Sequence, residues 1–502
     1  MPGTSADRIS SLIRVVDALV IRATDTPDGL AYTCRGTSAT WADALDGARR
    51  AASMLAERGA GPGVHCALVL PTSVTFIAAF YGAQLLGAVP VAINPRLPSH
   101  QIRRRIDALE CRVVVTTDDA DALQAFPPRP LHALPTPSPG DLSHLQITSG
   151  TTGDSRAVML RHRNVTATVL AARDRLEPRP DDVFVGWLPL HHDFGLIRFL
   201  LGPLLFGCPS HLVESSMGTL PTWLETISRT RATITGAPDV AYRLAPRLVP
   251  AARVNLRSLR VATSGGEVVR SSTIRAFEAH FDVPGRVRPG YGLAEATLGV
   301  TSLAPGDPLR VDASGHVTCG QAMTGVTVRI ESDDGTTAPA GTPGHIMVRS
   351  PGVFAGYLHD AAGTADVLRD GWLRTGDVGA LDADGHLYVH GRERAMLKRG
   401  GAVIAPRELE EVADAVAGVR RSAAVDVRCE DEGSERIIIV AEVERHLGEH
   451  ERRAARDAIA QVTTRAVGFS PHDIVLVAPG AIPRTATGKI RYDALRRQFT
   501  DP

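Results

Sequence analysis

Short runs of β-branched and other apolar residues alternate along the chain with segments whose apolar residues have helical spacing. Residues 112–116 and 211–213 are such runs, and residues 223–231 show the helical pattern. This alternation is typical of a mostly parallel sheet covered by helices. The pattern therefore predicts an α/β fold.

One apolar stretch, residues 64–93, has the length of a membrane span. Pro71 and Pro90 interrupt it, and polar side chains such as Gln84 dilute it. A helix that crosses a bilayer needs about 20 consecutive apolar residues, and proline breaks the interior of a helix. We therefore expect a strand, a helix and a strand in a buried sheet, and no membrane span.

Beyond residue 344 the pattern changes to shorter elements. The sequence Asp-Ala-Asp-Gly at residues 382–385 separates two strand-like runs, which predicts a hairpin. The elements expected after Arg392 are a helix at 406–416, strands at 422–427 and 436–443, and a helix at 450–465. They predict a compact α+β domain of about a hundred residues, a usual domain size.

Length and charge narrow the classes of function. The chain has 502 residues, more than one hydrophobic core usually supports, so two or more domains are expected. Its 55 acidic residues balance its 55 basic residues, so no strongly basic surface is available for nucleic acid. The six cysteines have neither disulfide nor metal spacing, and the N-terminal residues lack a secretory signal, which predicts a cytoplasmic protein. A small-molecule or protein partner is expected.

Lysine occurs only at Lys398 and Lys489, and arginine supplies the other 53 of the 55 basic residues. Arginine serves as well as lysine where a surface needs only positive charge, but it cannot replace a compact, flexible ammonium group. The two lysines are therefore candidates for specific roles, the alternative being that they remain by chance on a solvated surface.

A glycine- and hydroxyl-rich turn, ITSGTTGDSR, follows an apolar strand at residues 147–156. Glycine lets backbone N–H groups approach phosphate closely, and Ser and Thr hydroxyls add donors. By itself the turn fits either a plain surface turn or a phosphate-binding loop.

Further segments follow the glycine-rich turn in a fixed order. They are GWLPLHHDFGL at 186–196, TITGAPDVAYRL at 233–244, VATSGGEVVR at 261–270, PGYGLAEATLGV at 289–300, GWLRTGDVGALDADGHLYVHGRERAMLKRGG at 371–401 and PRTATGKIRYDALRR at 483–497. Together they resemble the ordered motifs of the acyl-adenylate-forming superfamily, which includes acyl-CoA synthetases and fatty acyl-AMP ligases. The resemblance implies activation of a carboxylic acid by ATP as an acyl-adenylate, followed by transfer of the acyl group to a thiol.

The resemblance also implies a domain organisation. We expect a large N-terminal AMP-binding domain at residues 1–394, made of mostly parallel α/β sheets plus a small β-barrel. A small, mobile α+β C-terminal domain is expected at residues 395–502.

The resemblance implies a nucleotide site assembled from several motifs. Tyr291 would lie against the adenine of ATP or AMP, and Asp377 would accept hydrogen bonds from both ribose hydroxyls. Arg392 would contact ribose or phosphate, and Glu295 would hold Mg²⁺ between phosphate oxygens as pyrophosphate leaves. The other residues implied for this site are Thr148, Ser149, Gly150, Thr151, Thr152 and Gly153 around the triphosphate, with Gly266, Gly290 and Gly292.

Further positions carry the catalysis of adenylation and the transfer to the thiol in this comparison. Lys489 would be the catalytic lysine that bridges the substrate carboxylate and the α-phosphate, a positioned cation of the kind that stabilises a transition state. Lys398, Gly400 and Gly401 would border the channel for coenzyme A after the small domain rotates. His192 would be the gate between the acyl pocket and that channel.

The sequence departs from the family pattern at two places. Arg156 stands where a lysine is usual near the phosphates, and Ala395 stands where the hinge usually has Asp or Lys. A hinge needs only to absorb backbone rotation, which alanine permits. An enzyme specialised for thioester formation from a preformed acyl-AMP is therefore an alternative to a complete ligase.

The sequence leaves two candidates for the acceptor thiol, an acyl carrier protein and coenzyme A. Phrases such as LPLHHDFGL resemble the fatty acyl-AMP ligases, which load an acyl carrier protein, but residues 301–325 are too short for the extra segment of those ligases. Residues 398–401 resemble the CoA-using relatives. We therefore predict an acyl-CoA ligase for a hydrophobic acid, with carrier-protein loading as an alternative. A non-catalytic ligand-binding relative is disfavoured because such a protein does not need Lys489.

Overall fold

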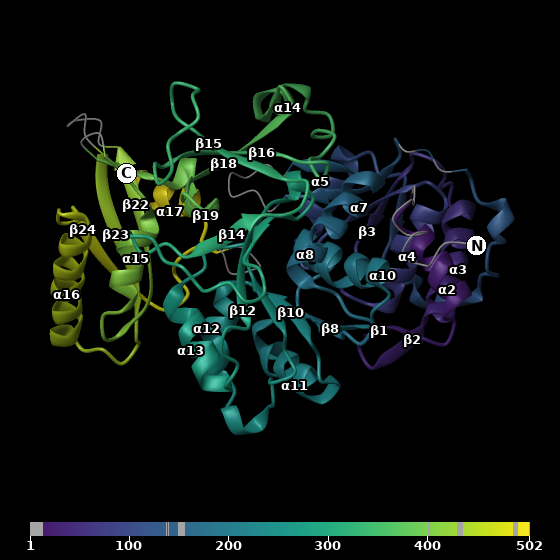
Figure 1. The fold of residues 1–502 in the computed structure, drawn as a ribbon, viewed down its shortest axis with the longest axis horizontal. Helices are drawn as coiled ribbons and strands as arrows, with labels where there is room; N and C mark the ends of the chain where they lie inside the picture. The colour runs from purple at the N-terminus through teal and green to yellow at the C-terminus, as the bar shows by residue number, and fades with distance from the viewer. Residues whose placement is uncertain are drawn as a thin grey trace.

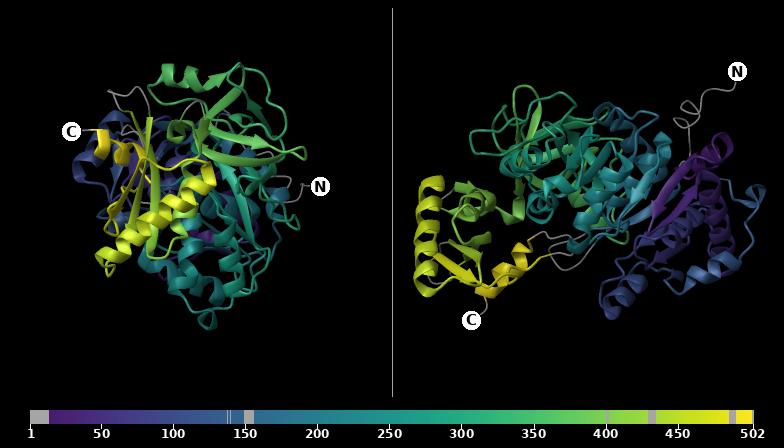
Figure 2. Two further views of the ribbon diagram at one scale, coloured as in Figure 1. Left: turned by 90° about the vertical axis from the view of Figure 1, so that its left-hand side faces the viewer. Right: turned by 90° about the horizontal axis from the view of Figure 1, so that it is seen from below.

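The computed structural model describes residues 14–136, 138, 140–148, 156–399, 402–428, 435–484 and 490–500. Elements from the N-terminal part of the chain lie at one end of the molecule and those from the C-terminal part at the other (Figures 1 and 2). The middle of the chain lies between them. Helices flank the sheets, and the expected α/β fold is confirmed.

A five-stranded sheet lies in the N-terminal part, in the order β5-β3-β4-β6-β7. Its strands are β3 (His65–Leu68), β4 (Val89–Ala92), β5 (Val113–Val115), β6 (Leu142–Ile147) and β7 (Ala157–Arg161). All pairs are parallel except β6 with β7. Between β3 and β4 the chain forms α4 (Val74–Leu85), which is buried from Phe76 onward. The strand–helix–strand predicted for residues 64–93 is confirmed.

A longer sheet follows the order β15-β16-β18-β19-β14-β13-β12-β11-β10-β8-β9-β1-β2, with β17 paired to β18. Its strands are β1 (Leu30–Cys34), β2 (Thr37–Thr40), β8 (Phe184–Gly186), β9 (Ser210–Leu212), β10 (Ile234–Ala237), β11 (Val261–Ser264), β12 (Val287–Gly292), β13 (Gly299–Ser302), β14 (Thr318–Ala322), β15 (Thr327–Glu331), β16 (Gly344–Arg349), β17 (Leu368–Arg369), β18 (Trp372–Leu381) and β19 (His386–Arg392). Pairs between β1 and β12 along this order are parallel, and pairs from β12 to β15 are antiparallel. Strand β12 therefore joins the parallel sheet to the antiparallel strands that stand where the β-barrel was expected.

The helices of these two sheets cover their faces and connect their strands. They are α2 (Asp17–Asp25), α3 (Trp41–Glu57), α4, α5 (Ser99–Ala108), α6 (Asp119–Ala125), α7 (His162–Ala171), α8 (Arg173–Leu176), α9 (Asp193–Leu196), α10 (Gly202–Phe206), α11 (Leu220–Thr230), α12 (Asp239–Leu248), α13 (Ser271–Phe281) and α14 (Ala361–Val367). A single turn of π-helix, η2 (Ile197–Leu201), connects α9 to α10. Residues 193–206 thus form one continuous helical segment, with His192 as its N-cap.

The C-terminal part is a separate α+β unit. It contains β20 (Leu397–Arg399), β21 (Ala402–Ile404), α15 (Pro406–Asp414), β22 (Val419–Arg428), β23 (Glu435–Val443), α16 (Glu449–Val467), β24 (Asp473–Val477) and α17 (Tyr492–Thr500). Two apolar clusters here consist of residues from Leu397 onward. The small unit touches the large one through Arg270, whose guanidinium lies 3.5 Å from Asp414 and 3.6 Å from Glu411. A boundary at residues 394 and 395 stays a prediction.

No helix in the described ranges is long and apolar enough to cross a bilayer. Five cysteines are described, and all are free thiols. Burial raises the pKa of Cys66 and Cys208 to about 12. These thiols are therefore protonated at neutral pH and behave as ordinary interior residues.

Candidate active site

Tyr291, Asp377 and Arg392 lie together where β12 meets the β18–β19 hairpin. Asp377 stands opposite Arg392 across the two antiparallel strands, and Tyr291 comes from β12. Tyr291 Oη donates to Asp377 Oδ2 at 2.6 Å, and Arg392 Nε lies 2.9 Å from Asp377 Oδ1. Each carboxylate oxygen of Asp377 therefore has a donor.

Burial and charge fix the protonation states of this group. Asp377 is 6% exposed, whereas the side chain of Arg392 is 59% exposed. The charge of Asp377 raises the pKa of Arg392, with smaller contributions from Tyr291, Glu295 and Tyr357. Burial, followed by Asp377, raises the pKa of Tyr291 well above its usual value. Tyr291 is thus a neutral donor and Arg392 a permanent cation at the edge of the site.

Glu295 lies in a short 3₁₀ turn, Ala294–Ala296, just after β12. Its Oε1 accepts a hydrogen bond from Tyr357 Oη at 2.8 Å. Among the described residues, Oε2 has no hydrogen-bond donor, so it is available to a ligand. Arg392 experiences the charge of Glu295 as well as that of Asp377, and Glu295 follows Tyr291 by four residues, just beyond the end of β12.

Arg156 lies beside Glu295 through Tyr357. Its guanidinium lies over the Tyr357 ring, 4.7 Å from the ring centre, and its Nε is 3.3 Å from Asp360 Oδ2. The planar guanidinium can stack on an aromatic ring while it pairs with a carboxylate, which an ammonium does less well. Arginine at position 156, where the family usually has lysine, therefore makes both a stacking contact with Tyr357 and an ion pair with Asp360.

The glycine-rich turn connects the two strands of the β6–β7 hairpin. Thr148 N donates to Arg156 O at 2.9 Å, and Arg156 N donates to Thr148 Oγ1 at 3.2 Å. These bonds close the base of the turn. Of the predicted site residues, Ser149, Gly150, Thr151, Thr152 and Gly153 lie outside the described residues, as do Gly400, Gly401 and Lys489. The backbone of Lys398 is described, and it pairs with Val403 in the β20–β21 hairpin.

Three predicted glycines lie at the end of the parallel strands. At Gly290 an added Cβ would meet Thr301 O of β13 at 3.2 Å, and at Gly292 it would collide with Leu298 O, just before β13. The backbone that approaches these two glycines is thus the chain's own. Gly266 has a φ of +79°, a left-handed conformation that favours glycine.

His192 precedes α9 as its N-cap. Its Nδ1 lies 2.6 Å from Asp193 Oδ1, and its side chain is 20% exposed. Phe194, two residues further, stacks on Phe199 with ring centres 6.0 Å apart. His192 therefore stands immediately before the helical segment 193–206. Its side chain is partly accessible and pairs with the Asp193 carboxylate.

The AMP-binding enzyme family model matches residues 19–358. The chain belongs to this family. It is 29% identical to a putative acyl-CoA synthetase of Caulobacter vibrioides, over 96% of this chain and 94% of that protein. It is 30% identical to a putative fatty-acid–CoA ligase of Mycobacterium tuberculosis, over 92% of each.

The fold is also that of solved members of the family. A structure from a study of fatty acyl-adenylate ligases of E. coli and L. pneumophila superimposes with a TM-score of 0.85 and 26% identity, over 98% of this chain and 99% of that one. The protein is therefore an AMP-binding, adenylate-forming ligase of the fatty acyl-CoA or acyl-AMP ligase type.

Two side chains near the AMP-binding motifs were not predicted from the sequence. Tyr357 donates a hydrogen bond to Glu295 and its ring stacks against Arg156. It lies between the recognisable motifs, so no sequence pattern indicates its role. Arg198 follows the HHDFG segment in an apolar run and is 7% exposed. A charged residue inside an apolar run is the one sequence signal that points to Arg198.

Proposed function

We propose that the protein is an acyl-CoA ligase that activates a hydrophobic carboxylic acid with ATP and then transfers the acyl group to coenzyme A. The observation that carries the proposal is the assembly of Tyr291, Asp377, Arg392 and Glu295 from three strands and a turn into one site. A carboxylate with two donors, a cation and a second carboxylate together suit a nucleoside polyphosphate with its metal ion.

The first half-reaction uses these groups in defined roles. Asp377 exchanges its protein donors for the ribose hydroxyls, Tyr291 lies against the adenine, and residues 148–153 surround the phosphates. A substrate carboxylate oxygen attacks the α-phosphorus, an O–P bond forms, and the bond to the bridging oxygen of pyrophosphate breaks. Glu295 would hold Mg²⁺, which would supply charge neutralisation at the phosphate oxygens. Lys489 would stabilise the charge between the carboxylate and the α-phosphate.

The second half-reaction transfers the acyl group. The thiolate of coenzyme A attacks the acyl carbon, a C–S bond forms, and the C–O bond to AMP breaks. We place the thiol channel beside Lys398, Gly400 and Gly401, with His192 as its gate, and the rotating domain at residues 395–502. Glycine at 400 and 401 leaves room for the narrow pantetheine arm.

Loading of an acyl carrier protein is the second candidate. Similarity to fatty acyl-adenylate ligases favours it. Against it, β13 ends at Ser302 and β14 begins at Thr318, so the connection between them is short. This favours coenzyme A.

The test presents purified protein with an acid panel, Mg²⁺-ATP and either coenzyme A or a holo-carrier protein, and measures thioester. A parallel reaction replaces acid and ATP with preformed acyl-AMP. We expect thioester with coenzyme A in both reactions. Carrier thioester without CoA thioester would reassign the acceptor, and thioester from acyl-AMP alone would identify an enzyme of the second half-reaction. Gly401→Leu should block transfer from acyl-AMP while adenylation continues.

A further inference from the structure

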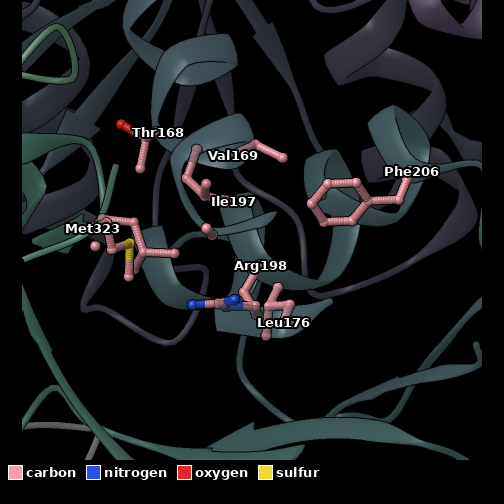
Figure 3. Close-up of a pocket in the computed structure, with 11 residues that line it drawn as sticks. Thr168, Val169, Leu176, Ile197, Arg198, Phe206 and Met323 are labelled. Carbon is pink, nitrogen blue, oxygen red and sulfur yellow. The ribbon is translucent and has the colours of Figure 1, made fainter. Parts of the chain in front are cut away.

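A small pocket opens beside the helical segment that follows His192. It lies between α7 and α8 on one side and η2, α10 and the start of β13 on the other (Figure 3). Its wall is formed largely by apolar side chains, among them Val169, Leu176, Ile197, Phe206 and Met323. Such a wall suits the hydrocarbon part of an acid.

One charged side chain, Arg198, lines this apolar pocket. Arg198 belongs to the π-helical turn Ile197–Leu201, and such turns often occur at functional sites. Figure 3 shows its guanidinium close to the side chain of Leu176 and directed toward Met323. Burial lowers the pKa of Arg198 to about 10, so the group still carries its charge at neutral pH.

Arg198 lacks a partner in the described part of the chain. No hydrogen bond or ion pair involves its guanidinium there, and its Nε is buried without an acceptor. Other buried arginines have at least one partner: Arg407 pairs with Glu411 at 2.9 Å. Arg288 donates from Nη1 to Ala304 O at 2.8 Å, although its Nε also lacks an acceptor. A buried, unpaired charge is strongly disfavoured. The structure therefore keeps at Arg198 a cation whose counter-ion must come from outside the described residues.

We propose that Arg198 binds a second carboxylate on the chain of the acid substrate, so that the preferred substrates are dicarboxylic acids with an apolar middle. This specificity rests on the proposed ligase function. Since a helix rises about 1.5 Å per residue, the six residues from His192 to Arg198 advance about 9 Å. With the reacting carboxylate near the proposed gate at His192, an acid of medium length reaches Arg198 with its other end.

The test compares dicarboxylic acids with monocarboxylic acids of equal carbon number. Acid-dependent AMP release should show a kcat/KM at least about 30-fold higher for the best dicarboxylate, as expected for a desolvated charge pair. Arg198→Met should abolish or invert this preference, and Arg198→Lys should retain part of it. Arg175→Met is the matched control, because Arg175 donates to Ala322 O outside the pocket wall; it should leave the preference unchanged.

Thermal unfolding supplies a readout that does not depend on catalysis. Without any acid, Arg198→Met should have a higher Tm than the unmutated protein, because an apolar side chain replaces an unpaired buried charge. A dicarboxylate alone should raise the Tm of the unmutated protein and not that of Arg198→Met. Equal use of both acid classes, an unchanged preference in Arg198→Met, or equal Tm shifts would overturn the proposal. If no acid releases AMP but the Tm shifts remain, the ligase function fails while the acid site stands.

Discussion

The proposed nucleotide side and the proposed acid side of the site differ in how their charged groups are paired. On the nucleotide side, Asp377 is bonded to Tyr291 and Arg392, and Glu295 is bonded to Tyr357. On the acid side, Arg198 is buried without a partner among the described residues. Every member of an adenylate-forming family meets the same nucleotide, so its binding groups can be organised by fixed protein partners. The acid differs between enzymes, and under the proposal above the substrate itself would supply the partner that Arg198 lacks.

The largest effect should come from Lys489, which would join the two sides. Lys489→Ala should reduce acyl-AMP formation by about 10²- to 10³-fold, the scale for loss of one preorganised donor, while transfer from preformed acyl-AMP continues. Pyrophosphate release measures the first step. Lys398→Ala removes the chain's other lysine and should leave that step intact. Normal adenylation by Lys489→Ala would refute this role.

The second largest effect is expected for Asp377→Ala, which should reduce kcat/KM for ATP by about 10²-fold. The estimate assumes two lost hydrogen bonds to a charged acceptor at about 1.5 kcal/mol or more each. Asp384→Ala is the control in the same hairpin, because that carboxylate forms an exposed ion pair with Arg310, and exposed pairs contribute little. Equal losses in the two variants would show that the hairpin's stability, and not the nucleotide, accounts for the effect.

Glu295→Gln should raise the Mg²⁺ concentration needed for half-maximal activity by about 10-fold, since loss of one carboxylate ligand weakens a hard cation's site. The side chain keeps its shape and an oxygen for the Tyr357 hydroxyl, so the Tm should change little. A Mg²⁺ titration of pyrophosphate release measures the effect. An unchanged titration would place the metal elsewhere.

The smallest effect is expected for Tyr357→Phe. This change removes the hydrogen bond to Glu295 but keeps the ring beneath Arg156, and one hydrogen bond contributes about 1 kcal/mol, so activity should fall about 5-fold. Arg156→Ala, which removes the cation and keeps the hydroxyl, separates the two contributions. Full activity in Tyr357→Phe would show that Glu295 needs no help in orientation.

The sequence singled out Tyr291, Asp377 and Arg392, which the structure brings together, but it did not single out Tyr357 or Arg198, and the difference has a physical reason. Tyr291, Asp377 and Arg392 stand in ordered motifs that resemble those of the adenylate-forming superfamily. Tyr357 and Arg198 acquire their roles only through contacts made by folding, across β7 and inside a pocket, which linear spacing does not encode. The ends of strands were also predicted less well than their positions. The strand predicted at 422–427 extends over Val419–Arg428, because its pairing with β23 continues beyond the apolar run.

Acid-dependent exchange of labelled pyrophosphate into ATP tests the central claim most directly, because it reports formation of the acyl-adenylate without any thiol. We predict exchange that requires both Mg²⁺ and an acid and that disappears in Lys489→Ala. Absence of exchange with every acid, in a preparation that converts acyl-AMP and coenzyme A to thioester and AMP, would contradict the account.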